Sequence, residues 1–129
     1  MEITVGLKGT VTATVNDTNT AKTVGSGSLD VFATPMMVAL MEKASCVAIE
    51  NNLEEGFTTV GTLVNVEHLS ATPVGMLVTV ESVVTAVDGR KISFEVIAYD
   101  EAGIIGKGTH DRFIVNAEKF IAKTYSKKN

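Results

Sequence analysis

The chain carries two regions in which apolar and polar residues alternate, one on each side of a long apolar segment. Residues 3–15 alternate with a period of two, interrupted at Lys8 and Gly9, and predict an N-terminal strand that bends at Gly9. The same period returns after Gly56. It predicts four further strands, over residues 60–68, 76–86, 92–98 and 104–115.

Short turns join the later strands. Residues 87–90 contain Asp-Gly, the pair that favours a two-residue hairpin turn, and residues 100–103 form a second tight turn. Strands joined by such turns must lie antiparallel. The polar, glycine-rich stretch of residues 16–28 is typical of a loop.

The central apolar segment predicts one long helix. Thr34 is a suitable N-cap and Pro35 suits the first helical position, so the helix is expected from Met36 to about Asn52. Its apolar residues lie on nearly every side, which is typical of a helix buried on most faces. A short terminal helix is predicted over residues 117–124, with Asn116 as its N-cap.

These elements predict one α+β domain over residues 1–129. Only the antiparallel sheet is available to cover the apolar helix, so the sheet should curl around it, and this arrangement is the hotdog architecture. A single copy leaves a sheet edge and part of the helix uncovered. Pairing of two copies about a two-fold axis is therefore expected, which predicts a homodimer.

Composition narrows the function. The net charge is −4 and no basic tract is present, which argues against a nucleic-acid partner. A single cysteine, Cys46, excludes an internal disulfide and a cysteine-based zinc site, and fits a reducing compartment. No signal peptide or membrane-spanning stretch is visible, so a soluble, cytoplasmic protein is expected. The two histidines are far apart in sequence and form no metal motif, and no bound metal is expected.

Three polar residues stand where the pattern favours apolar ones: Thr34, Glu42 and His68. On the second predicted strand, His68 shares a face with Val60, Thr62, Val64 and Val66. Each has an ordinary explanation: an N-cap for Thr34, a surface ion pair for Glu42, a hydrogen-bonded core position for His68. Together they supply a hydroxyl, a carboxylate and an imidazole near one helix–sheet seam, which is the set that acyl transfer requires.

Three segments resemble the fluoroacetyl-CoA thioesterase-like branch of the hotdog superfamily. They are residues 31–42 (VFATPMMVALME), residues 60–75 (VGTLVNVEHLSATPVG) and residues 106–112 (GKGTHDR). The resemblance covers about residues 30–120, and the spacing from threonine to glutamate to histidine is kept without gaps. It implies thioester hydrolysis by a catalytic set of Thr34, Glu42 and His68, with Gly61 and Arg112 lining the acyl-thioester site.

The chemistry agrees with this implication. Backbone N–H groups at the positive end of the long helix could stabilise the oxyanion, and Gly61 allows close approach of the backbone. His68 suits a general base near neutral pH, and Glu42 could orient it or shuttle its proton. Two roles stay open for Thr34, either attack on the carbonyl or positioning of a water molecule.

One segment departs from that branch. The fluoroacetyl-specific enzyme has a phenylalanine-bearing lid ahead of its catalytic threonine, whereas residues 23–29 here contain no aromatic residue. We therefore expect hydrolysis of a short- or medium-chain acyl-CoA and not fluoroacetyl specificity. Coenzyme A would be part of the substrate, with no further cofactor. The alternatives are a hotdog 3-hydroxyacyl-thioester dehydratase or hydratase, in which Thr34 only caps the helix, and a non-catalytic acyl-CoA-binding module.

Overall fold

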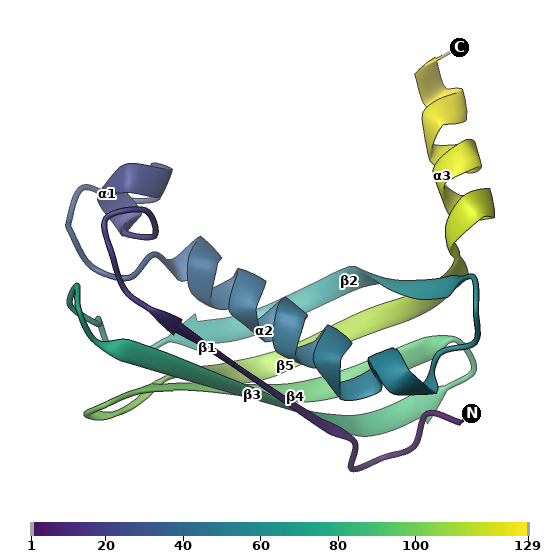
Figure 1. The fold of residues 1–129 in the computed structure, drawn as a ribbon, viewed down its shortest axis with the longest axis horizontal. Coiled ribbons are helices and arrows are strands. Elements are labelled where there is room, and N and C mark those ends of the chain that lie inside the picture. Colours follow the sequence, from purple (N-terminus) through teal and green to yellow (C-terminus); the bar gives the residue numbers. More distant parts are fainter. Residues whose placement is uncertain (1, 129) are drawn as a thin grey trace.

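The computed structural model describes residues 2–128, which form one antiparallel sheet and one long helix with short helices at either end (Figure 1). The strands are β1 (Lys8–Thr14), β2 (Phe57–His68), β3 (Leu77–Asp88), β4 (Lys91–Asp100) and β5 (Gly103–Asn116). The helices are α1 (Ala21–Val24), α2 (Thr34–Ile49) and α3 (Ala117–Tyr125), with short 3-10 helices η1 (Glu50–Asn52) and η2 (Ser126–Lys128).

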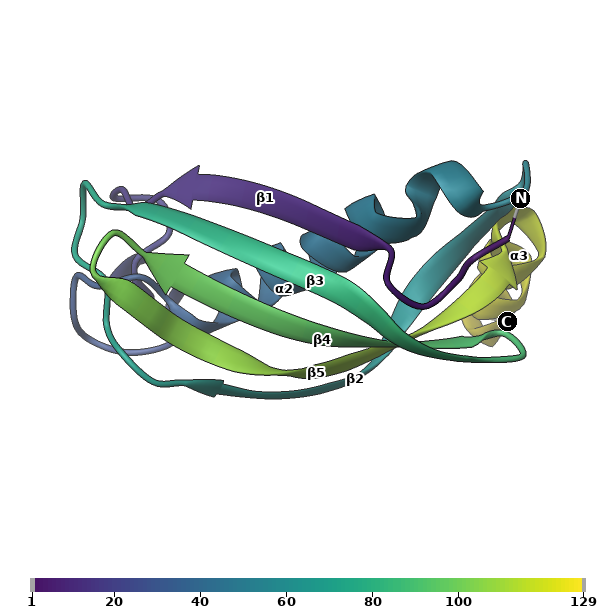
Figure 2. The same cartoon turned by 90° about the horizontal axis from the view of Figure 1, so that it is seen from below.

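The five strands follow the order β1-β3-β4-β5-β2, and every neighbouring pair is antiparallel. Figure 2 shows the strands side by side in this order, with α2 behind the sheet. The two predicted turns are present, and the pairs Asp88–Lys91 and Asp100–Gly103 close them. The predicted α+β architecture, a curled antiparallel sheet around one long helix, is therefore confirmed.

The core lies between α2 and the sheet. Met37, Met41 and Ile49 of α2 are fully buried against apolar side chains of β3, β4 and β5. The strand residues in this core are Val78, Val80, Val84, Ile92, Phe94, Val96, Ala98 and Ile105. The prediction that α2 is buried on most faces holds only in part for one chain. Ala39 is exposed, and Val38 and Val47, on opposite sides of the helix, are only partly covered.

The helix packs closest to the sheet at β1. A Cβ atom on Gly9 would lie 2.1 Å from the carbonyl oxygen of Ala44 and 2.6 Å from the amide nitrogen of Ala48. The backbones of β1 and α2 thus approach within a distance that only glycine permits. The glycine that interrupts the apolar alternation at position 9 is therefore needed for the close packing of β1 on α2.

Two predictions about the first 33 residues are wrong. The N-terminal strand starts at Lys8 and not at residue 3, because the chain turns at Gly6, whose φ of 98° is left-handed. The predicted loop of residues 16–28 contains α1, a helix of four residues. Thr20 caps its start by accepting from the amide of Thr23, and Gly25 ends it in a left-handed conformation.

A β-bulge changes which residues of β2 face the helix. Gly61 pairs with Arg112 and Leu63 pairs with Asp111, so Thr62 is an extra residue in the ladder. Thr59 and Gly61 point toward α2 before the bulge, whereas Val66 and His68 do so after it. The predicted single face from Val60 to His68 is therefore wrong, and without the bulge Gly61 and His68 would face opposite sides.

The terminal helix α3 begins where β5 ends. As predicted, Asn116 caps it, accepting a hydrogen bond from the amide of Lys119 at 3.0 Å. Figure 1 shows α3 standing away from the sheet, and none of its residues is buried. Within residues 2–128 there is no helix with both the length and the apolar character needed to span a bilayer.

Candidate active site

The start of α2 presents a free hydroxyl. The N-cap is Ala33 and not Thr34 as predicted, and no side chain caps the helix. Thr34 is the first residue of α2, and its Oγ1 lies 2.7 Å from Nδ1 of His68, the last residue of β2. Because the hydroxyl takes no part in capping, it can serve in chemistry together with the imidazole.

Main-chain hydrogen bonds fix the two segments that carry this pair. The amide of Phe32 donates to the carbonyl of Thr72 at 2.9 Å, and Val31 forms a β-bridge with Pro73. The hydroxyl of Thr72 is buried and donates to Oδ2 of Asp100 at 2.8 Å. The approach to Thr34 and the segment after His68 are thereby tied to each other and to the end of β4.

The imidazole of His68 is suited to proton transfer. Burial lowers its pKa below the ordinary histidine value, and the backbone of Ser70 offsets this only in part. Nε2 is buried and has no hydrogen-bond partner among residues 2–128. With the proton on Nε2, Nδ1 offers a lone pair to the Thr34 hydroxyl, which is the arrangement that a general base needs.

A pocket of about 240 Å³ opens at this pair. Its lining residues are Ala21, Ser26, Val31, Phe32, Thr34, His68, Leu69, Ser70 and Ala71. Phe32 is the one aromatic residue among them, and its side chain is 2% exposed because it packs into the core. Residues 23–29 contribute Ser26 to the lining, so no aromatic residue of that segment lines the pocket.

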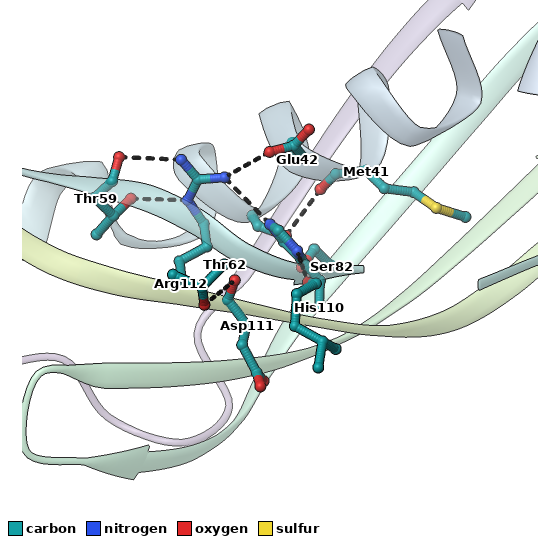
Figure 3. Close-up of polar contacts among 10 residues, drawn as sticks. Met41, Glu42, Thr59, Thr62, Ser82, His110, Asp111 and Arg112 are labelled. Carbon is teal, nitrogen blue, oxygen red and sulfur yellow. Dashed lines mark hydrogen bonds and ion pairs between the residues drawn. The ribbon is translucent and has the colours of Figure 1, made fainter. Parts of the chain in front are cut away.

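Glu42 belongs to a second polar cluster, further along α2 (Figure 3). Its Oε2 lies 3.2 Å from NH1 of Arg112, whose side chain is nearly fully buried while that of Glu42 is 41% exposed. Arg112 also donates from Nε to the hydroxyl of Thr59 at 2.8 Å and from NH2 to the carbonyl of Thr59 at 3.0 Å. Hydrogen bonds to Thr59 thus fix the buried guanidinium of Arg112. Its ion pair in turn holds the partly exposed carboxylate of Glu42 in place.

Gly61 makes room for this cluster. A Cβ atom at this position would lie 2.6 Å from Oε2 of Glu42 and 3.2 Å from both NH1 of Arg112 and Cε1 of His110. Of the residues predicted for the site, the structure therefore brings Gly61, Glu42 and Arg112 together. It brings Thr34 and His68 together as a separate pair.

The two groups do not meet within one chain. Among residues 2–128, Glu42 has its ion pair with Arg112 and makes no hydrogen bond to His68, and it does not line the pocket at Thr34. The helix start also offers fewer oxyanion donors than expected. The amides of Met36 and Met37 donate to the carbonyl of Ala33 and Pro35 has no N–H, which leaves the amide of Thr34 as the candidate.

The sequence reasoning missed Thr59 and His110 as members of the second cluster. His110 is 1% exposed, its Nδ1 lies 2.7 Å from the carbonyl of Leu63, and its Nε2 lies 3.2 Å from NH1 of Arg112. The signal for His110 was its spacing of two from Arg112 on one strand, which places both on the same face. Thr59 gave no such signal, because the bulge after it changes the face that the alternation indicates. Within the described part of the chain, no group of three or more side chains could hold a metal ion.

Comparison with known proteins points to one family. The family model described as FlK, fluoroacetyl-CoA-specific thioesterase, matches residues 15–118. A fluoroacetyl-CoA thioesterase of Streptantibioticus cattleyicolor is 45% identical over 98 residues, which are 76% of this chain and 70% of that protein.

Solved structures agree over nearly the whole length. A mutant of the fluoroacetyl-CoA thioesterase FlK in complex with acetyl-CoA has a TM-score of 0.91 at 37% identity, covering 98% of this chain and 100% of that one. A Thermus thermophilus protein described as a thioesterase superfamily member also has a TM-score of 0.91, at 30% identity, covering 98% of this chain and 94% of that one.

Proposed function

From its membership of the fluoroacetyl-CoA-specific thioesterase family, whose members are thioester hydrolases of the hotdog fold, we propose a specific reaction for this chain. It hydrolyses a short- or medium-chain acyl-CoA to the free acid and coenzyme A. The contact between Thr34 and His68, at 2.7 Å, carries the proposal. It places a hydroxyl and a base at the mouth of a pocket, at the positive end of a helix of 16 residues.

In the proposed reaction, His68 moves a proton between oxygen and sulfur. Nδ1 accepts a proton from Thr34 or from a water molecule that Thr34 holds, and the oxygen forms a bond to the thioester carbonyl carbon. The carbon–sulfur bond then breaks, and the sulfur of coenzyme A takes the proton from the imidazole. If Thr34 attacks, a water molecule cleaves the acyl-threonine ester in a second round. The reaction needs no metal or further cofactor.

We propose that the working unit is a homodimer formed through β2. This strand is one of the two edges of the sheet and, at 12 residues, it is longer than the other edge, β1, which has 7. Leu63 and Val64 at its middle are exposed. Antiparallel pairing of two β2 strands about their middle would place the His68 end of one beside the Phe57 end of the other. The Thr34–His68 pair would then lie nearer to the cluster of Gly61, Glu42 and Arg112 of the partner subunit than to that of its own chain.

The pocket supports the proposed substrate class. Its volume of about 240 Å³ suits a small acyl group, and Phe32, its one aromatic lining residue, is packed in the core and leaves no aromatic ring free to close over that group. We therefore propose that the fluoroacetyl group receives no preference over acetyl or a short alkyl chain.

Cys46 is a free thiol, which fits a reducing compartment such as the cytoplasm.

The first test follows release of free thiol from acetyl-CoA with a thiol reagent, for the wild type and for His68→Ala and Glu42→Ala. Activity should fall by about 100-fold or more in each variant, because each loses a proposed proton-transfer or orienting group. Tyr99→Phe is the matched control, since it deletes a hydrogen bond to Glu81 within the sheet and should keep its activity. Undiminished turnover in both site variants would refute the assignment.

The second test compares acetyl-, fluoroacetyl-, butyryl- and octanoyl-CoA as substrates of the same preparation. We expect kcat/KM for fluoroacetyl-CoA to stay within about tenfold of that for acetyl-CoA, because one atom in a pocket changes binding by little. A preference of several hundredfold for the fluorinated substrate would contradict the proposed substrate class. Hydration of enoyl-CoA without thiol release would instead identify a hydratase, and binding without either reaction would identify a sensor.

A further inference from the structure

We propose that His110 is a positioning residue, held neutral with its proton on Nδ1, whose Nε2 lone pair fixes the guanidinium of Arg112 and through it the carboxylate of Glu42. The effect on catalysis rests on the hydrolase function proposed above. The protonation state of the His110 ring does not depend on that function.

The protonation of His110 follows from its two partners. A carbonyl oxygen only accepts hydrogen bonds, so Nδ1, at 2.7 Å from the carbonyl of Leu63, must carry a proton and donate it. A guanidinium only donates, so Nε2, at 3.2 Å from NH1 of Arg112, must offer a lone pair. Both contacts are satisfied only by the neutral ring with the proton on Nδ1.

Arg112 depends on this acceptor. Its Nε and NH2 bind the hydroxyl and carbonyl of Thr59, and the two protons of NH1 are shared between Glu42 and His110. The contacts therefore use four of the five N–H donors of the guanidinium. If Nε2 of His110 could not accept, one N–H of a buried cation would lose its partner, and the guanidinium could turn away from Glu42.

The surroundings of His110 keep it neutral. Burial lowers its pKa below the ordinary value, and the positive charge of Arg112 on the same strand acts in the same direction. The carboxylates of Glu42 on α2 and Asp111 on β5 act in the opposite direction, as does the hydrogen bond to Leu63 on β2. From β4, the ring of Phe94 stacks on the imidazole at a centroid distance of 6.0 Å and contributes no charge. Protonation would turn Nε2 into a donor that faces another donor.

The direct test reads the tautomer of His110 by nitrogen NMR on the intact protein at neutral pH. The chain contains two histidines, so the loss of one set of ring signals in His110→Gln assigns both. We expect His110 to show a protonated Nδ1 and an unprotonated Nε2. A proton on Nε2, or rapid averaging between the two forms, would overturn the proposal.

A charge-coupling test follows the pKa of His110 by NMR titration. Glu42→Gln should lower it further, because a neighbouring negative charge is lost, and Arg112→Met should raise it. Tyr99→Phe should leave it unchanged. If Arg112→Met does not fold, Glu42→Gln decides, since Glu42 is partly exposed. An unchanged pKa in Glu42→Gln would show that His110 is not coupled to the carboxylate and would overturn the proposal.

The catalytic consequence is tested by two substitutions of His110. His110→Phe keeps a ring to pack against Phe94 and removes the acceptor, whereas His110→Gln supplies an amide oxygen that can accept from Arg112. We expect kcat for acetyl-CoA to fall about tenfold in His110→Phe with KM nearly unchanged, and to recover most of that loss in His110→Gln. Equal activity in the two variants would contradict the positioning role. A wild type without hydrolase activity would refute the proposed function and leave the NMR result standing.

Discussion

His68 and His110 are both held neutral by burial, yet they have opposite tasks. Nδ1 of His68 meets a hydroxyl that can give up a proton, while Nε2 of His110 meets a guanidinium that cannot. The pKa of each lies below the ordinary histidine value of about 6.5. The different roles of the two imidazoles are therefore set by their hydrogen-bond partners and not by their burial.

The lowered pKa values predict how stability depends on pH. The unfolded chain takes up protons at about pH 6.5, whereas folded His68 and His110 do so only at lower pH. The stabilisation from the neutral rings is complete above that value and is lost as the pH falls through the folded pKa values. The free energy of unfolding from urea titrations should decrease from pH 7 to pH 5, and less steeply in His110→Gln. An identical slope in wild type and variant would contradict this.

Gly61→Ala should separate activity from stability. The added methyl group would lie 2.6 Å from Oε2 of Glu42, the partly exposed end of a flexible side chain that can move aside. It would also lie 3.2 Å from Arg112 and His110, which need to shift by only a few tenths of an ångström. We expect kcat/KM for acetyl-CoA to fall about 100-fold, because the carboxylate is displaced. The free energy of unfolding should change by less than about 1 kcal/mol.

The matched control for this substitution is Thr58→Ala, at an exposed position of the same strand. It should change neither quantity. If Gly61→Ala kept full activity, the position of Glu42 would be irrelevant to turnover.

Polar residues that interrupt an apolar pattern singled out Thr34, Glu42 and His68 in the sequence. The structure places Thr34 and His68 in contact, and Glu42 apart from them beside Arg112. The cap assigned to Thr34 was wrong because Ala33 starts the helix and the hydroxyl is drawn to the imidazole. Thr59 could not be found, since its role depends on a guanidinium that arrives from 53 residues away.

At the scale of elements, local rules fixed most boundaries to within a few residues. Turn residues marked both hairpins, and Asn116 marked the start of α3. Two features were not predicted. The bulge at Thr62 had a signal in Gly61, since a glycine inside a strand often marks a bulge, but the alternation around it was read as one unbroken face. The helix α1 is so short that only its caps, Thr20 and Gly25, could have indicated it.

Gly9→Ala should test the contact between β1 and α2. A methyl group would lie 2.1 Å from the carbonyl oxygen of Ala44, and relief would require the two backbones to separate. We expect the free energy of unfolding to fall by about 3 kcal/mol, at the upper end for overpacking. Chemical denaturation followed by circular dichroism measures it.

Thr12→Ala, at an exposed position of β1, is the control for this substitution and should cost less than about 0.5 kcal/mol. A loss below about 1 kcal/mol in Gly9→Ala would mean that the strand and helix can slide apart.

At the scale of the whole molecule, one chain is incomplete on two counts. The outer side of α2 keeps partly exposed apolar residues, and β2 leaves an edge of 12 residues unpaired. A second copy paired through β2 would cover that edge in the proposed dimer. The sequence predicted this incompleteness from the apolar helix, but it could not show that Thr34–His68 and Glu42–Arg112 form separate groups.

The dimer predicts that Leu63→Lys weakens association. Leu63 is 47% exposed at the middle of β2, and two lysines would face each other near the two-fold axis. Sedimentation equilibrium should give twice the chain mass for the wild type and a larger share of single chains for the variant. Val5→Lys, at a residue that is also exposed but lies outside β2, should leave the mass unchanged. A wild type that sediments as a single chain at high concentration would refute the dimer.

The attachment of α1 has a consequence for how selectivity could evolve. Backbone atoms hold this segment in place: the amide of Ala21 donates to the carbonyl of Val31, and that of Lys22 donates to the carbonyl of Leu29. Such bonds do not depend on which side chains residues 23–29 carry. Substitutions within residues 23–29 can therefore change the acyl preference without moving Thr34 and His68. Substrate selectivity and catalysis can then evolve separately.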